Sequence, residues 1–194
     1  DNYGLGENIT FHADAEENIA IGAHALNDTS GASLRNIAIG QNAMTTLDIG
    51  EDNIAIGSQS LVLLKTGLKN ISIGSYALTA ADGSETENTA VGYYSMNGMN
   101  NDGSVKNVAI GSQSMAGITT ASVASCVGIG YEALKGAAGT SENGTVAIGA
   151  SALKALTSGA GNTAVGYQSG LLLDEGHSNT SLGYWALKTE KEGS

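Results

Sequence analysis

Aromatic side chains are few in this sequence, and most of them occupy two adjacent positions of a recurring pattern. Directly after a recurring glycine come Tyr93, Tyr131, Tyr167 and Tyr184, and one position later come Tyr76, Tyr94 and Trp185. An aromatic ring offers an apolar face with a polar edge, which suits stacking on a sugar. These residues are therefore candidates for receptor binding, with Tyr184–Trp185 first and Tyr93–Tyr94 second. The alternative is that the rings cover a corner of the fold or pack between subunits.

Carboxylates are the second group that could do chemistry, because a pair with unequal burial can hydrolyse a glycosidic bond. Most acidic residues lie in segments rich in Gly, Ser, Thr and Asn: Asp28, Asp48, Glu51, Asp52, Asp82, Glu85, Glu87, Asp102, Glu142, Asp174 and Glu175. Such segments are typical of loops. Since no apolar pocket surrounds these carboxylates in sequence, we interpret them as a solvated surface and expect no enzyme.

Metal and cofactor chemistry has little support. His12, His24 and His177 are isolated, without a His-x-His pair, so that only an assembly of several chains with one histidine near a shared axis could gather three ligands. Cys126 is the single cysteine, which excludes a disulfide within one chain and indicates an inert buried thiol. The glycines follow neither the phosphate-loop nor the dinucleotide pattern. We predict no metal and no cofactor.

Charge and hydropathy exclude further classes of partner. The formal net charge is −11, which disfavours nucleic acid and anionic membranes as ligands. No apolar run reaches the length of a membrane-spanning helix, so membrane insertion is not expected. Because the chain starts at Asp1 without a secretory signal, we expect it to be an excised fragment.

A sequence unit that repeats along the chain must position all these residues. Its consensus is Asn, a β-branched residue, Ala, Ile or Val, Gly, two variable residues, Ala or Ser, and Leu or Met, as in the segment 53–61. The repeat glycines recur every 16 to 19 residues, at positions 6, 22, 40, 57, 74, 92, 111, 130, 149, 166 and 183. Eleven units therefore cover almost the whole chain, and we predict a single β-roll repeat domain over residues 1–194.

Each column of the repeat predicts a local structure. The segment Asn-Ile-Ala-Ile-Gly alternates with period two, which predicts a short strand with Ile19 and Ile21 on one face and Ala20 on the other. Because both faces are apolar, one of them needs a partner outside the coil, and we predict that the alanine column faces another subunit. The pair Ala25–Leu26 and its equivalents are expected to be buried.

Two columns are expected to shape the backbone. The glycine column indicates a positive φ or a close backbone approach at a corner. The asparagine column predicts a ladder of hydrogen bonds between stacked coils, interrupted at Cys126 and Thr145. A helical solenoid is the competing architecture, but the units are too short for a helix pair and glycine recurs in every one. The predicted fold is an all-β parallel β-solenoid of about eleven coils.

The motif also carries a family resemblance. Asn-x-Ala-Ile-Gly-x-x-Ala/Ser resembles the repeat of YadA-type trimeric autotransporter adhesin heads, and variants such as the segment 162–169 resemble repeats in bacteriophage tail fibres. The resemblance implies a left-handed β-roll assembled as a homotrimer. Coils longer and less uniform than those of the adhesin heads favour the tail-fibre interpretation.

The resemblance implies a function in attachment. We expect a non-enzymatic structural and receptor-binding segment of a virion tail fibre, with a polysaccharide or protein on the bacterial surface as its partner. Three identical faces would bind through multivalency. One alternative is the head of a bacterial trimeric autotransporter adhesin on the bacterial outer surface. Another alternative is a capsule-degrading tail fibre, which requires a pair of carboxylates in a groove.

Overall fold

The described residues form eleven short strands, one in each predicted repeat unit. A computed structural model describes residues 1–27, 31–81, 83–99, 103–118, 122–136 and 143–187. The strands are β1 (Tyr3–Leu5), β2 (Ile19–Ile21), β3 (Ile37–Ile39), β4 (Ile54–Ile56), β5 (Ile71–Ile73), β6 (Thr89–Val91), β7 (Val108–Ile110), β8 (Val127–Ile129), β9 (Val146–Ile148), β10 (Thr163–Val165) and β11 (Thr180–Leu182). None of the described residues forms a helix long and apolar enough to cross a membrane.

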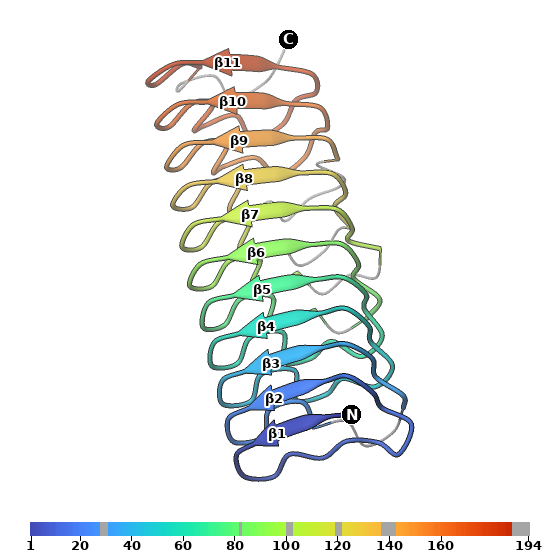
Figure 1. Cartoon of the computed structure of the whole chain (residues 1–194). Helices are drawn as coiled ribbons and strands as arrows, with labels where there is room; N and C mark the ends of the chain where they lie inside the picture. Colours follow the sequence, from blue (N-terminus) through green and yellow to red (C-terminus); the bar gives the residue numbers. More distant parts are fainter. Residues whose placement is uncertain (28–30, 82, 100–102, 119–121, 137–142, 188–194) are drawn as a thin grey trace.

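The strands form one parallel sheet whose order follows the chain, from β1 to β11. Each strand pairs in register with the next, so that Ala38 lies opposite Ala55 and Ile39 opposite Ile56. Figure 1 shows the resulting rod, with every strand pointing the same way and the two termini at opposite ends. The prediction of an all-β parallel solenoid is confirmed. At about 4.8 Å per strand, the sheet is roughly 50 Å long.

The alanine column lies inside the coil, and the prediction that it faces another subunit is wrong. The central residues of β2 to β10 are buried within a single chain, and the alanines among them form one hydrophobic core with the second half of each unit. An added Cβ at Gly128, which replaces alanine in this column, would lie 2.7 Å from Met115 Cγ. The central residues therefore pack against the Leu and Met side chains of the preceding coil.

The width of the coil interior, or lumen, explains why the prediction for the alanine column is wrong. Period-two alternation separates two faces, but it does not say which of them is inside. In this narrow coil one wall carries large side chains, such as Leu61, Met96 and Met115, and the opposite wall has room only for Ala, Ser or Gly. Where the strand residue is Ser72, the residue across the lumen is Ser60, and their hydroxyl oxygens lie 2.7 Å apart.

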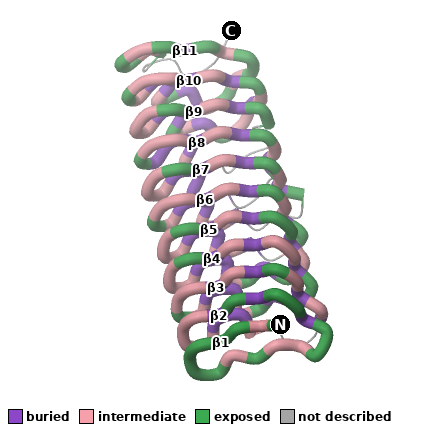
Figure 2. The backbone as a smooth tube through the Cα atoms, viewed as in Figure 1, coloured by how far each residue is buried: buried purple, intermediate pink, exposed green. Residues whose placement is uncertain are grey.

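The flanking strand residues point outward and form a continuous apolar face. They are Ile, Val or Thr in β2 to β10, partly exposed throughout, with Ile56, Ile73 and Ile110 among the most open. Figure 2 shows the buried residues recurring at the same places on successive coils, with more open residues between them. The face that lacks a cover in the single chain is therefore the β-branched one.

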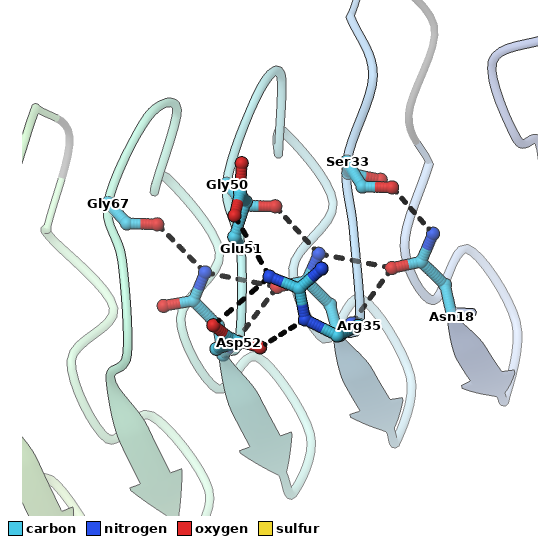
Figure 3. Close-up of polar contacts among 9 residues, drawn as sticks. Asn18, Ser33, Arg35, Gly50, Glu51, Asp52 and Gly67 are labelled. Atoms are coloured by element: carbon cyan, nitrogen blue, oxygen red, sulfur yellow. Dashed lines mark hydrogen bonds and ion pairs between the residues drawn. The ribbon is translucent and has the colours of Figure 1, made fainter. Parts of the chain in front are cut away.

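The asparagine ladder is present as predicted. Asn36 Nδ2 donates to Asn18 Oδ1 at 3.1 Å and to the Gly50 carbonyl at 2.8 Å. Its own Oδ1 accepts from the backbone N–H and the side-chain Nδ2 of Asn53, at 2.9 and 3.0 Å. Each side chain thus joins three successive coils, as Figure 3 shows for the start of the rod. Buried amides of this kind are stable only when they are fully bonded.

The ladder changes at β8 and β9. The Cys126 N–H still donates to Asn107 Oδ1 at 3.0 Å, but a thiol replaces the amide that would continue the series. Among the described residues, Thr145 Oγ1 is buried without a hydrogen-bond partner. The series resumes at Asn162, whose Oδ1 accepts from the backbone N–H of Asn179 at 2.9 Å.

Positive φ angles at residues other than glycine recur three times in most coils and mark the corners. They fall two positions after the repeat glycine, four positions after it, and on the residue before the asparagine, as at Gln59, Leu61 and Lys69. The repeat glycines themselves have φ angles between 125° and 149°. The prediction for the glycine column is confirmed, whereas the left-handed residues that are not glycine were not predicted.

Candidate functional site

The two aromatic columns lie along one edge of the rod, just beyond the ends of the strands, where the arrowheads stand in Figure 1. Six of the seven predicted residues gather into two groups. The mid-rod cluster consists of Tyr76, Tyr94 and Tyr93, beyond β5 and β6. The C-terminal cluster consists of Tyr167, Tyr184 and Trp185, beyond β10 and β11.

Rings within each cluster pack face to face or edge to face. In the mid-rod cluster Tyr76 stacks on Tyr94 with ring centroids 4.9 Å apart, and Tyr93 meets Tyr94 edge-on at 4.5 Å. In the C-terminal cluster Tyr184 stacks between Tyr167 at 5.3 Å and Trp185 at 4.7 Å. Such ring pairs hold one another in place, which makes each cluster a preformed surface.

The rings remain open to solvent within the single chain. Tyr93 is 53% exposed, Tyr184 68% and Trp185 46%. Tyr76 and Tyr94 are half-buried, and each meets the ring of Tyr93 edge-on. Tyr131, the seventh predicted residue, is 52% exposed and joins neither cluster. The exposed rings of Tyr93, Tyr131, Tyr184 and Trp185 are therefore available to a ligand or to another subunit.

Tyr131 is followed by a polar cluster that the sequence analysis missed. Glu132 accepts from Lys135 Nζ at 2.7 Å and from Lys154 Nζ at 2.7 Å, and Lys135 also donates to Gln113 Oε1. These residues come from three successive coils. Lys135 and Lys154 occupy the same position in neighbouring repeats, five residues after the glycine, so column-by-column comparison could have found them.

The Glu132 cluster makes stability depend on pH. Hydrogen bonds from Lys135, and then from Lys154, hold the pKa of the Glu132 carboxyl below its usual value. The stabilisation is therefore present above the ordinary pKa of glutamate and is lost as the pH falls through the lowered, folded-state value. Replacing Glu132 with Gln should cost about 1 kcal/mol at neutral pH, since the two lysines then lack a counter-charge.

Urea unfolding at neutral and acid pH tests this dependence. We expect the gap between wild type and Glu132→Gln to close as the carboxyl protonates. Glu87→Gln is the matched control, because that carboxylate lies 3.9 Å from Lys106 at an exposed site and should contribute little. A gap that stays constant with pH would contradict the assignment.

Two of the loop carboxylates, Glu51 and Asp52, form ion pairs with one arginine, whereas Glu85 is buried and accepts a hydrogen bond from the Gly83 N–H at 3.1 Å, so the prediction of a solvated carboxylate is wrong for Glu85. Arg35 Nε donates to Asp52 Oδ1 at 2.6 Å, and Arg35 Nη2 donates to Glu51 Oε2 at 3.0 Å (Figure 3). The hydrogen bond from Arg35 lowers the pKa of Asp52, which suits a permanently charged partner and not a proton donor. Asp28, Asp82, Asp102 and Glu142 lie outside the described residues.

Arg35 and Asp52 also belong to a charge column that was not anticipated. The residue before each ladder asparagine alternates in sign over six coils: Glu17, Arg35, Asp52, Lys69, Glu87 and Lys106. Opposite charges on adjacent strands attract, whereas like charges would repel. The column therefore favours the observed register, and its alternation could have been found by aligning the repeats.

Metal ligands do not gather. Within the described part of the chain, no three residues among His, Cys, Asp and Glu lie close enough together to hold a metal ion. His12 contacts Asp14 at 3.7 Å, and His24 lies 3.4 Å from Asn8 Nδ2. Cys126 is buried, as predicted. The aromatic clusters are thus the features with the clearest capacity to bind a ligand.

Comparisons of the chain with protein-family models, with curated proteins and with solved structures found no match. The functional argument therefore rests on the rod, its outward apolar face and its exposed aromatic clusters.

Proposed function

We propose that the chain is a non-enzymatic, receptor-binding segment of a bacteriophage tail fibre that attaches to the bacterial surface. The observation that carries this proposal is the presence of two exposed aromatic clusters on one rigid rod. Stacked rings bind sugars through apolar contact and do not need opposite charge. That suits a chain with a net charge of −11 meeting a negatively charged cell surface. The resemblance of the repeat motif to tail-fibre repeats supports the same function.

The outward β-branched face supports assembly with further copies of the chain. An apolar face of this length is larger than soluble monomers usually expose. Its repeat of one strand about every 4.8 Å is matched best by a second identical sheet. We propose a homotrimer of left-handed β-rolls, in which Ile54, Ile110 and their equivalents are covered. Three copies would present each aromatic cluster three times and bind through avidity.

Sedimentation equilibrium tests the assembly. We expect a mass of about 58 kDa, three times the 19.4 kDa of one chain. Ile110→Asp should shift the protein toward monomer, because it places a charge in the covered face. Leu63→Asp is the control, since Leu63 is exposed at 41% outside the strands. A wild-type monomer at micromolar concentration would refute the trimer.

Binding to cells tests the function. Fluorescently labelled protein should bind selected bacterial strains, and enzymatic removal of surface polysaccharide should abolish that binding. Tyr184→Ala and Trp185→Ala should weaken binding strongly. Gln41→Ala serves as the control, because Gln41 is an exposed residue at the position of Tyr184 in a coil without aromatics. Binding that survives loss of both rings would show that the C-terminal cluster is not the receptor site.

A further inference from the structure

The column directly after the repeat glycine has an internal pattern in the C-terminal half of the rod. Beyond β6 to β11 it reads Tyr93, Ser112, Tyr131, Ala150, Tyr167 and Tyr184. A tyrosine therefore stands on every second coil from β6 to β10, with a small residue between, and one more stands on β11. In the N-terminal half the same column carries Glu7, Ala23, Gln41, Ser58 and Ser75.

Backbone hydrogen bonds join the coils that carry this column in register. The N–H of Gln113 donates to the Tyr93 carbonyl at 2.9 Å, and the N–H of Ser151 donates to the Tyr131 carbonyl at 2.8 Å. The N–H of Trp185 donates in the same way to the Tyr167 carbonyl at 3.0 Å. Because neighbouring coils are about 4.8 Å apart, tyrosines on alternate coils repeat at about 10 Å along the rod.

Exposed rings alternate here with short side chains. We call the surface formed by Tyr93, Tyr131 and Tyr167 the track. Tyr93, Tyr131 and Tyr167 are each about half exposed, and neither Ser112 nor Ala150 carries a side chain long enough to reach the level of the rings. Beside these rings, the next column supplies the amides of Gln113 and Gln168, both partly exposed. The Gln113 oxygen accepts from Lys135, which leaves its amide nitrogen for a ligand. Rings with amides alongside match the apolar faces and the hydroxyl edges of sugars.

We propose that this track binds an extended, unbranched polysaccharide lying parallel to the rod axis. In an extended β-1,4-linked chain successive sugars are turned over, so that the same face recurs on every second sugar, at close to the spacing of alternate coils. Each tyrosine of the track would then stack on one sugar of each pair. The inference rests on the proposed receptor-binding function and names its ligand class.

A compact or branched ligand would not use this periodicity. One cluster, such as Tyr184 with Trp185, would be sufficient to bind a compact ligand. A helical polymer such as an α-1,4-linked glucan turns its faces away from a straight line of rings. The regular alternation of large and small residues over five coils is explained by a straight ligand whose repeat is two coils long.

The test uses the assembled wild-type protein and oligosaccharides of increasing length. Probes are β-1,4-linked oligomers of glucose and of N-acetylglucosamine, from disaccharide to octasaccharide, with α-1,4-linked glucan oligomers for comparison. Fluorescence of Trp185, the single tryptophan, and calorimetry report binding. For at least one β-1,4 series, affinity should rise with each added pair of sugars until the oligomer spans the track, and the α-1,4 series should show no such rise.

Variants separate the track from the C-terminal cluster. Tyr131→Ala should weaken binding of the octasaccharide about tenfold, and Tyr131→Phe should restore the wild-type affinity. Gln41→Ala is the matched control in the same column. Circular dichroism melting should show that the two Tyr131 variants and Gln41→Ala are folded, since Tyr131 is half exposed. Tyr167→Ala is a second variant that should lose the same octasaccharide affinity.

The outcomes distinguish this inference from the proposed function. If strain-specific, polysaccharide-dependent binding occurs but no β-1,4 series gains affinity with length, or Tyr131→Ala binds the octasaccharide as wild type does, the track is refuted and receptor binding stands. Protection of Tyr131 and Tyr167 from oxidative labelling in the free assembly would place the rings between subunits, and it would also refute the track. If no strain is bound, the proposed function itself fails.

Discussion

Replacing Gly57 with alanine is expected to destabilise the rod by roughly 3 kcal/mol or more. Gly57 has φ 131°, a conformation that a residue with a Cβ adopts only at a cost. The added Cβ would also lie 2.6 Å from the carbonyl carbon of Gly74 in the next coil. Backbone atoms in a stacked coil cannot move aside as a flexible side chain can. Urea unfolding of wild type and variant, followed by circular dichroism, measures the loss.

Gly183→Ala is the matched control for this prediction. Gly183 has nearly the same φ, 125°, but no atom of the described residues lies within 4 Å of its added Cβ. It should therefore report the conformational penalty alone, and the difference between the two variants gives the penalty for contact with the next coil. Equal losses would mean that close stacking does not require glycine in this column.

Replacing Asn53 with alanine is the second change expected to have a large effect, roughly 3 to 5 kcal/mol. The variant removes the Oδ1 that accepts from the backbone N–H and side chain of Asn70, at 2.9 and 3.1 Å. It also removes the amide that donates to Asn36 Oδ1 and to the Gly67 carbonyl, at 3.0 and 2.8 Å. All of these groups are buried, and each one left unpaired costs about 1 to 3 kcal/mol.

Cys126→Ala tests the same column where the amide is already missing. The backbone N–H of residue 126 keeps its hydrogen bond to Asn107 Oδ1 in both the wild type and Cys126→Ala, because the donor belongs to the backbone. We expect a loss of about 1 kcal/mol, the value for a small change of buried volume. Chemical denaturation of both variants gives the comparison. If Asn53→Ala is no more damaging than Cys126→Ala, the ladder is not a main source of stability.

Strands, ladder and glycine corners could be predicted because each follows from local chemistry repeated many times. A stretch such as residues 53–57 combines an amide, β-branched residues and glycine in an order that suits one structure. The inward face could not be predicted from the same pattern. Ala55 and Ile56 are both apolar, and only the width of the assembled lumen decides that the smaller side chain points inward.

The aromatic clusters were predictable in part. Counting from the repeat glycine placed Tyr93 and Tyr184 in one column and Trp185 in the next, and the structure brings these columns together in space. The backbone preferences of Tyr and Trp did not predict the left-handed conformation at Tyr94 and Trp185, since bulky side chains disfavour it. Stacking between coils overrides that preference, and stacking is a property of the assembled rod.

The left-handed corners have a consequence for how the rod forms. Among the described residues, 28 other than glycine have a positive φ, including Leu61, Met96 and Leu134, and each opposes its own intrinsic preference by about 1 to 2 kcal/mol. The left-handed corners therefore destabilise an isolated coil. Only contacts with a neighbouring coil compensate for this cost in free energy. The first coils should form slowly as a nucleus, and each later coil should then add rapidly on the template beneath it. Growth would resemble the lengthening of a filament, and the kinetic barrier would lie almost entirely at its start.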